Sequence, residues 1–292
     1  MGVSPSEFIH PADKAALENM EAIPGFSLLV KKFLEMGYES LFYGTNMATN
    51  IRLSPKQLPK IYNHLPPICK KLGIAEPELY LNMDPFPNAF TFGDTKIFIT
   101  LTSGLVDCMT EEELDAVIAH ECGHILCRHV LYHSMANLLK TSADAFGVLG
   151  KLSIPVQLAI YYWSRMSELS ADRCAAIITS PDLVSSTMAR LAGGPKSITQ
   201  EINFEEWAKQ ADEYERIRQS NNWSKTLQAL AIMTQDHPFS AVRVREIINW
   251  CNSADYTRLK EAMEQEDNYC PSCKARLNGK WGFCPNCGAK LK

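Results

Sequence analysis

The sequence lacks any run of apolar residues long enough to cross a membrane. Its longest stretch without Asp, Glu, Lys or Arg is 13 residues, from Leu152 to Ser164, and Pro155 interrupts it. A spanning helix needs roughly 20 apolar residues. The N-terminus also lacks the basic and apolar pattern of a secretory signal. We therefore expect a cytoplasmic protein; residues 143–163 are expected to form core or a lid, and peripheral membrane contact through them is the less favoured alternative.

The sequence also lacks a strong excess of charge, internal repeats and low-complexity segments. It has 29 basic and 33 acidic residues, for a net charge of −4. A chain this balanced is not built to neutralise phosphates, so no nucleic-acid partner is expected. Hydrophobic residues make up 46% and charged residues 21%, which are ordinary values for a globular protein. The 292 residues are enough for one large domain or two smaller ones.

The cysteines do not form the even pattern of a disulfide scaffold. Six of the 10 are scattered singly, and the other four are Cys270, Cys273, Cys284 and Cys287 in two Cys-Pro-x-Cys pairs. Two such pairs supply four thiolates for a closed tetrahedral zinc site. We therefore predict a structural zinc ion in a small ribbon over residues 270–292, which could bind a protein partner.

The pattern of apolar residues predicts a mostly helical α+β fold with a small antiparallel sheet. Residues 88–92 and 96–100 flank Gly93-Asp94-Thr95, which is typical of a hairpin. Thr110, with Glu113 three residues later, forms a capping box that opens a helix running to about residue 140. Further helices are expected over about 1–75, 164–178 and 204–258.

The sharpest motif is His120-Glu121-Cys122-Gly123-His124, inside the helix that the capping box opens. Residues four apart share one face of a helix, so both imidazoles can bind one metal ion. Glu121 then lies beside a metal-bound water and can accept its proton.

A third metal ligand is expected on a second helix. The extended histidine motif of one zinc-protease class does not fit, because Cys127 and Val130 occupy the positions that it requires. His129 and His133 are out of register with it, and we predict them on a polar helix face. Glu168 and Asp172 are four apart, so Glu168 can bind the metal while Asp172 accepts the outer N–H of a ligand histidine.

The combination of His120-Glu-x-x-His124 with Glu168-x-x-x-Asp172 resembles the gluzincin metallopeptidases, which include HtpX, the CAAX prenyl endopeptidase and the Oma-type proteases. The similarity extends over roughly residues 55–250 and includes Pro87-Asn-Ala-Phe90, Ser103-Gly-Leu105 and His237-Pro238 with a following arginine. The resemblance implies a zincin-like fold and a zinc metalloendopeptidase. Many relatives are integral membrane proteins, and this sequence is more similar to the compact members without clear spans.

The resemblance also implies roles for residues outside the zinc motif. Asn88, Ala89 and Phe90 would lie on an edge strand that pairs with extended substrate backbone. His237 would donate to the scissile carbonyl oxygen; the equal alternative is a loop histidine that positions the next helix. Arg243 would pair with a buried acid such as Asp172, and the alternative is a surface arginine.

The sequence thus predicts a metallopeptidase domain over residues 1–260, a polar linker over 261–269 and the ribbon over 270–292. The expected enzyme holds one catalytic and one structural zinc ion and acts on a peptide or protein substrate. The alternative function is a catalytically silent binding protein that acts through the ribbon. The four residues His120, Glu121, His124 and Glu168 argue against it, because a silent relative is expected to lose one of them.

Overall fold

The N-terminal quarter of the chain is helical. The computed structural model describes residues 3–142, 154–219 and 240–267, together with 272, 273, 275, 277 and 282–290 near the C-terminus. Prolines occupy first-turn positions in several of the first helices, where their missing N–H costs nothing. The elements of this part are α1 (Pro5–Phe8), α2 (Pro11–Glu21), α3 (Phe26–Glu35), α4 (Tyr38–Thr49), β1 (Ile51–Arg52), α5 (Pro59–Tyr62) and α6 (Leu65–Leu72).

A four-stranded sheet follows, in the order β1-β2-β4-β3. Its other strands are β2 (Glu78–Asn82), β3 (Ala89–Phe92) and β4 (Phe98–Thr102). The predicted hairpin is the antiparallel β3–β4 pair, whereas β2 and β4 are parallel. The small sheet is therefore mixed, and the prediction of an antiparallel sheet was wrong for this pair. Because β3 is an edge strand, one side of its backbone has no strand partner in the sheet.

The central helices are α7 (Ser103–Cys108), α8 (Glu111–Leu126), α9 (Val130–Ser142) and α10 (Ile154–Ile178). The Thr110–Glu113 capping box opens α8 as predicted, with both reciprocal hydrogen bonds formed. The single helix expected to residue 140 is instead broken after Leu126. Arg128 adopts a left-handed conformation with φ 61°, which turns the chain before α9 begins.

The last helices are α11 (Pro181–Gly193), α12 (Lys196–Thr199), α13 (Phe204–Gln219), α15 (Ser240–Cys251) and α16 (Ala254–Asp267). Helix α16 continues through most of the segment predicted as a linker over 261–269. The reason is that Leu259 is buried and Met263 packs against the main core, so this polar stretch still has an apolar stripe.

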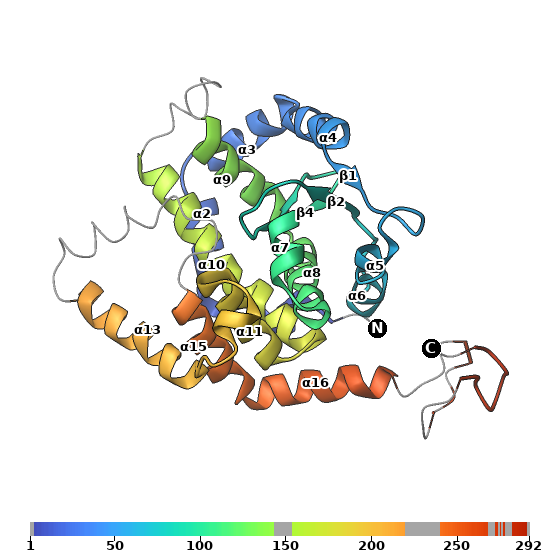
Figure 1. Cartoon of the computed structure of the whole chain (residues 1–292). Helices are drawn as coiled ribbons and strands as arrows, with labels where there is room; N and C mark the ends of the chain where they lie inside the picture. The colour runs from blue at the N-terminus through green and yellow to red at the C-terminus, as the bar shows by residue number, and fades with distance from the viewer. Residues whose placement is uncertain are drawn as a thin grey trace.

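The two largest buried clusters among the described residues hold most of the molecule together. The larger one joins the sheet, α6, α8, the C-terminal half of α10, α11 and α15. The other joins α2, α3, α9 and the N-terminal half of α10. Figure 1 shows α8 in the middle of the molecule, between the sheet and α10. The mostly helical α+β fold is confirmed, and the N-terminal helices pack into the same body as α8 and α10.

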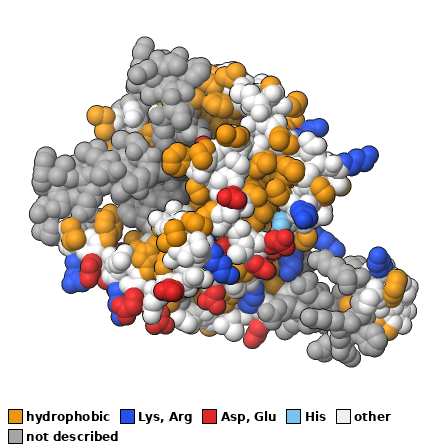
Figure 2. All heavy atoms as spheres, viewed as in Figure 1, with side chains coloured by type: hydrophobic (Ala, Val, Ile, Leu, Met, Phe, Trp, Pro, Cys, Tyr) orange, Lys and Arg blue, Asp and Glu red, His pale blue; other side chains and the backbone are white. Residues whose placement is uncertain are grey.

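No helix among the described residues is both long and apolar enough to traverse a bilayer. Residues 143–153 of the segment considered for membrane contact lie outside the described residues, and 154–163 form the start of α10. On the face in Figure 2, apolar side chains gather in the upper part, whereas acidic and basic side chains mix along the lower edge. This face therefore has no broad patch of one charge.

Candidate functional site

Helices α8 and α10 form the centre of the site because they approach each other very closely at Gly123. A Cβ atom at Gly123 would lie only 2.9 Å from Cys174 Cβ and 3.2 Å from Ala171 Cα. Small residues therefore face each other where the two helices meet. This packing brings the first helix motif against the acidic residues of the second.

Three side chains from these helices converge on one point. His120 Nε2 and His124 Nε2 are 3.1 Å apart on the inner face of α8. The Glu168 carboxylate on α10 lies 3.5 Å from His120 Nε2 and 3.3 Å from His124 Nε2. All three side chains are buried. Two imidazoles and one carboxylate in this arrangement are the donor set of a catalytic zinc site, whose fourth position stays open for water.

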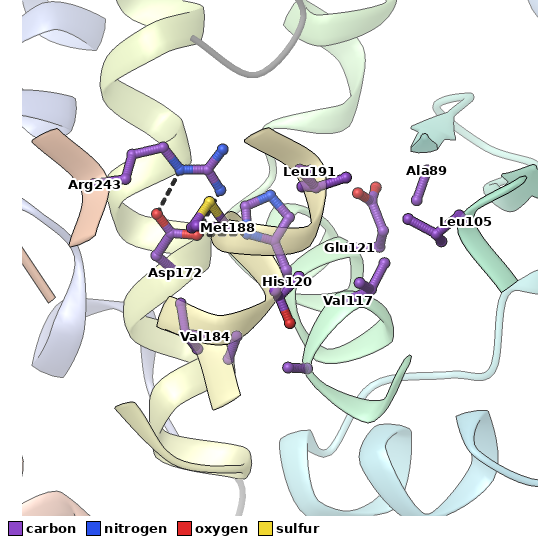
Figure 3. Close-up of a pocket in the computed structure, with 13 residues that line it drawn as sticks. Ala89, Leu105, Val117, His120, Glu121, Asp172, Val184, Met188, Leu191 and Arg243 are labelled. Atoms are coloured by element: carbon purple, nitrogen blue, oxygen red, sulfur yellow. Dashed lines mark hydrogen bonds and ion pairs between the residues drawn. The ribbon is translucent and has the colours of Figure 1, made fainter. Parts of the chain in front are cut away.

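The outer side of His120 contacts a buried carboxylate. Asp172 Oδ1 lies 3.0 Å from His120 Nδ1. Arg243 on α15 donates two hydrogen bonds to Asp172, at 2.6 and 2.7 Å (Figure 3). Its Nη1 is also 3.1 Å from the Glu168 carboxylate. Burial would raise the pKa of Asp172, but the charge and hydrogen bonds of Arg243 outweigh it and hold that pKa below its ordinary value. Asp172 is thus an anion that can fix the orientation of the His120 ring.

Glu121 points away from this network, toward β3 (Figure 3). Its side chain is 2% exposed, and Oε2 accepts a 2.6 Å hydrogen bond from the Thr91 hydroxyl on β3. The role of Thr91 was not predictable from the sequence, because no local pattern connects a strand residue to a helix residue 30 positions later. The contact holds one carboxylate oxygen of Glu121 in a fixed position.

His129 does not lie on a polar helix face, because it precedes α9 and is buried, so the prediction was wrong for this residue; His133 lies on α9 on the same side as Asn137. The left-handed residue Arg128, between α8 and α9, turns His129 back toward α8, where His129 Nδ1 is 3.1 Å from His124 Nδ1. His129 is 1% exposed. His133 packs against the His124 ring and contacts Ser167. No glycine or proline marks this break in the sequence, so the pattern gave no sign of it.

Two hollows adjoin Glu121. A cavity of about 210 Å³ is lined by Asn88, Ala89 and Phe90, which were predicted to bind substrate, together with polar side chains of the site. Its polar lining includes Glu121, His124, His133, Asn137 and Glu168. On the other side of Glu121, an apolar pocket is lined by Ala89, Leu105, Val117, Val184, Met188 and Leu191 (Figure 3). The edge strand β3 thus borders both hollows.

The remaining predicted site residues are only partly described. His237 and Cys270 lie outside the described residues. Cys273, Cys284 and Cys287 come together, with Sγ atoms within 4.8 Å of one another and 3.7 Å between Cys273 and Cys284. The Asn286 backbone N–H and side-chain amide point at two of these sulfurs. The cluster has the form of a thiolate metal site.

Comparison with known proteins identifies the family. The model of peptidase family M48 matches residues 55–251. The plastoglobule-localized metallopeptidase 48 of Arabidopsis thaliana chloroplasts is 33% identical over 260 residues, covering 87% of this chain and 74% of that protein. Protease HtpX homolog 2 of Methanosarcina acetivorans is 29% identical over 203 residues, covering 58% of this chain and 68% of that protein. No solved structure gives a significant match. The chain therefore belongs to peptidase family M48 and is a zinc metallopeptidase.

Proposed function

We propose that this metallopeptidase cleaves internal peptide bonds of protein substrates with a zinc ion held by His120, His124 and Glu168. The observation that carries the proposal is the convergence of these three side chains, whose donor atoms lie within 4.8 Å of one another. Nothing in the site or among the relatives favours the catalytically silent alternative.

The charges around the three side chains suit a divalent cation. Asp13, Glu121, Glu168 and Asp172 are all buried within the site region, and Arg243 is the buried cation among them. Buried charges need compensation, and a divalent ion bound to these side chains would balance the excess of carboxylates. When bound, zinc lowers the pKa of its water ligand and polarises a carbonyl oxygen.

We assign proton transfer to Glu121. Its buried carboxylate lies next to the ligand His120 in sequence and lines the cavity where substrate would bind. Oε2 is occupied by the Thr91 hydroxyl, which leaves Oε1 to accept the proton of the attacking water and to pass it to the departing amine. His237 remains our proposed donor to the scissile carbonyl oxygen.

We propose that extended substrate backbone pairs with the open edge of β3. Asn88, Ala89 and Phe90 border the cavity, and the edge position leaves backbone groups of β3 available for a further strand. Backbone pairing binds many sequences. The apolar pocket beside Glu121 has a volume of about 20 Å³, so it would accept a methyl-sized group, such as the side chain of alanine, and would favour small residues there.

We propose a second, structural zinc ion in the C-terminal ribbon, bound by Cys270, Cys273, Cys284 and Cys287. The close approach of the described sulfurs and the N–H groups of Asn286 support it. Residues 1–260 would form the peptidase domain, residues 261–269 the connection, most of which is the end of α16, and 270–292 the ribbon, which would bind a protein partner. Four thiolates fill the coordination sphere, so this zinc would have no catalytic role.

The location of the protein is also a proposal. We favour a cytoplasmic protein, with peripheral membrane contact through 143–163 as the alternative. The name of the Arabidopsis relative places that protein at plastoglobules, which supports testing lipid surfaces. Co-sedimentation with phospholipid vesicles separates the two possibilities.

The deciding experiment compares the wild type with Glu121→Gln. Both proteins should bind two zinc ions per chain, and only the wild type should cleave unfolded casein. A residual rate below about 1% is expected, because loss of a positioned base typically costs 10²–10⁴-fold. Casein cleavage by Glu121→Gln at the wild-type rate would refute the mechanism. Absence of zinc from the wild type after metal loading would refute the assignment of the metal ligands.

A further inference from the structure

The second histidine ligand is backed by a chain of buried polar groups. His124 Nδ1 lies 3.1 Å from His129 Nδ1, and His129 Nε2 lies 3.1 Å from Asp13 Oδ2. The same Asp13 oxygen accepts a 2.6 Å hydrogen bond from the Ser170 hydroxyl. Asp13 is 0% exposed, His129 1% and His124 5%. These contacts are therefore shielded from water. Hydrogen bonds orient side chains most strongly in such a buried environment.

The order of the atoms fixes the direction of each contact. His124 Nε2 faces His120 and Glu168, so with the proposed zinc ion bound its lone pair would point at the metal and its hydrogen would be on Nδ1. His129 Nδ1 must then accept, which places the hydrogen of His129 on Nε2. That nitrogen faces the Asp13 carboxylate, which can only accept when ionised. Fixing the tautomer of His129 thus also fixes that of His124.

The state of Asp13 agrees with this direction. Burial would raise the pKa of Asp13, but the contacts from His129 and Ser170 outweigh it, so the pKa lies below its ordinary value. His129 Nε2 makes no hydrogen bond of good geometry among the described residues, and Asp13 Oδ2, 3.1 Å away, is the carboxylate oxygen beside it. The carboxylate is therefore the acceptor that a small rotation of the His129 ring would bring into line.

Two separate parts of the chain build the arrangement. The left-handed turn at Arg128 ends α8 and directs His129 toward His124. Asp13 comes from the first turn of α2, which packs along α10, and the His10 side chain caps that helix. Helix α2 precedes residues 55–251, the part of the chain that matches the family model.

We infer that Asp13 and His129 are positioning residues for the zinc ligand His124, so that helix α2 forms part of the metal centre. The inference rests on the proposed zinc site. His120 is backed directly by the Asp172 carboxylate, whereas His124 is backed by a carboxylate acting through a second imidazole. The chemical role of both carboxylates is the same: each holds one ligand ring with Nε2 toward the metal.

The alternative role for Asp13 is purely structural, namely to anchor α2 on α10 through Ser170. The two roles predict different results in a double-mutant cycle on the full-length protein. A positioning role requires His129, so the effect of Asp13→Asn on zinc affinity should vanish once His129 is replaced by leucine. A structural role would lower stability in either background, and its effect would add to that of His129→Leu.

The measurement is metal affinity, by competition with a chelator, using zinc and then cobalt(II). Thiolate ligands give cobalt intense charge-transfer absorption that a site of two histidines and a glutamate lacks, so the spectrum distinguishes the two sites. We expect Asp13→Asn and His129→Leu each to weaken the histidine site about 10- to 100-fold. His129→Asn, whose amide oxygen can replace Nδ1 as acceptor, should lose less affinity than His129→Leu.

Ser170→Ala is the matched control. It removes the other polar partner of Asp13 and leaves His129 and His124 in place, so the affinity should stay within about threefold of the wild type. Wild-type affinity in Asp13→Asn, or full additivity with His129→Leu, would overturn the inference. If the wild type itself binds no metal at the histidine site, the proposed function fails, and the cycle separates that outcome from failure of the positioning role alone.

Discussion

Replacement of Gly123 by alanine tests whether the close approach of α8 and α10 builds the metal site. The added Cβ would lie 2.9 Å from Cys174 Cβ and 3.2 Å from Ala171 Cα. Carbon atoms in contact prefer about 3.5–4 Å, so the helices must separate locally by several tenths of an ångström. Gly123 precedes His124 and Ala171 precedes Asp172, so the separation acts directly on the site.

The expected cost follows from two opposing effects. Overpacking a close-packed interface typically costs about 1–3 kcal/mol. Alanine recovers about 0.5–1 kcal/mol of helix propensity relative to glycine. The net loss of unfolding free energy should therefore lie between about 0 and 2.5 kcal/mol. Because a metal site tolerates displacements of only about 0.5 Å, zinc affinity should fall about tenfold or more.

Gly44→Ala provides the control for this experiment. Gly44 lies within α4, and a Cβ atom there would meet nothing within 4 Å. Alanine at this position should leave zinc affinity unchanged and raise stability by up to about 1 kcal/mol. Urea unfolding and zinc titration of both variants decide the question. Gly123→Ala with wild-type stability and wild-type zinc affinity would refute the reasoning about helix contact.

Two further predictions concern single hydrogen bonds. Thr91→Val removes the donor to Glu121, and we expect kcat to fall about tenfold or more, as for other hydrogen bonds to charged groups, while the zinc content stays constant. Thr100→Val on β4 is the control. Equal losses of kcat in both variants would contradict the assignment. The Asp115 carboxylate, which accepts a hydrogen bond from His64 Nδ1 at 2.7 Å, raises the pKa of His64 above its ordinary value. The resulting stability is present below the unfolded-state pKa of about 6.5 and disappears as the pH rises through the folded-state pKa. Urea unfolding should therefore show that His64→Gln lowers the free energy of unfolding by at most about 1 kcal/mol near pH 5.5 and by less near pH 9, since Asp115 is partly exposed. An equal loss at the two pH values would contradict this role of His64.

The features that depend on local sequence were predicted well. The capping box fixed the start of α8, and the four-residue spacing put His120 and His124 on one face. The same spacing put Glu168 and Asp172 on one face of α10. The hairpin was visible because its turn contains Gly93, whose φ is +120°. Each of these signals lies within a few residues of the structure that it specifies.

The features that depend on distant contacts could not be read in this way. The parallel pairing of β2 with β4 skips over β3, and no adjacent pattern encodes it. The helix break at Arg128 uses a residue type that rarely adopts a left-handed conformation, and tertiary contacts impose it there. The long-range partners of Glu121 and His129, on β3 and α2, also had no local signal.

The support of His124 has a consequence for related peptidase domains. A histidine that binds zinc through Nε2 must direct its Nδ1–H to an acceptor, because an unpaired buried donor is costly. Here the acceptor is His129, and its own orientation depends on Asp13 from a helix that precedes the family match. A domain that lacks a helix equivalent to α2 must therefore orient the acceptor behind the second histidine of its motif in another way. For this chain, deletion of residues 1–21 should thus weaken metal binding at the histidine site, even though every zinc ligand remains.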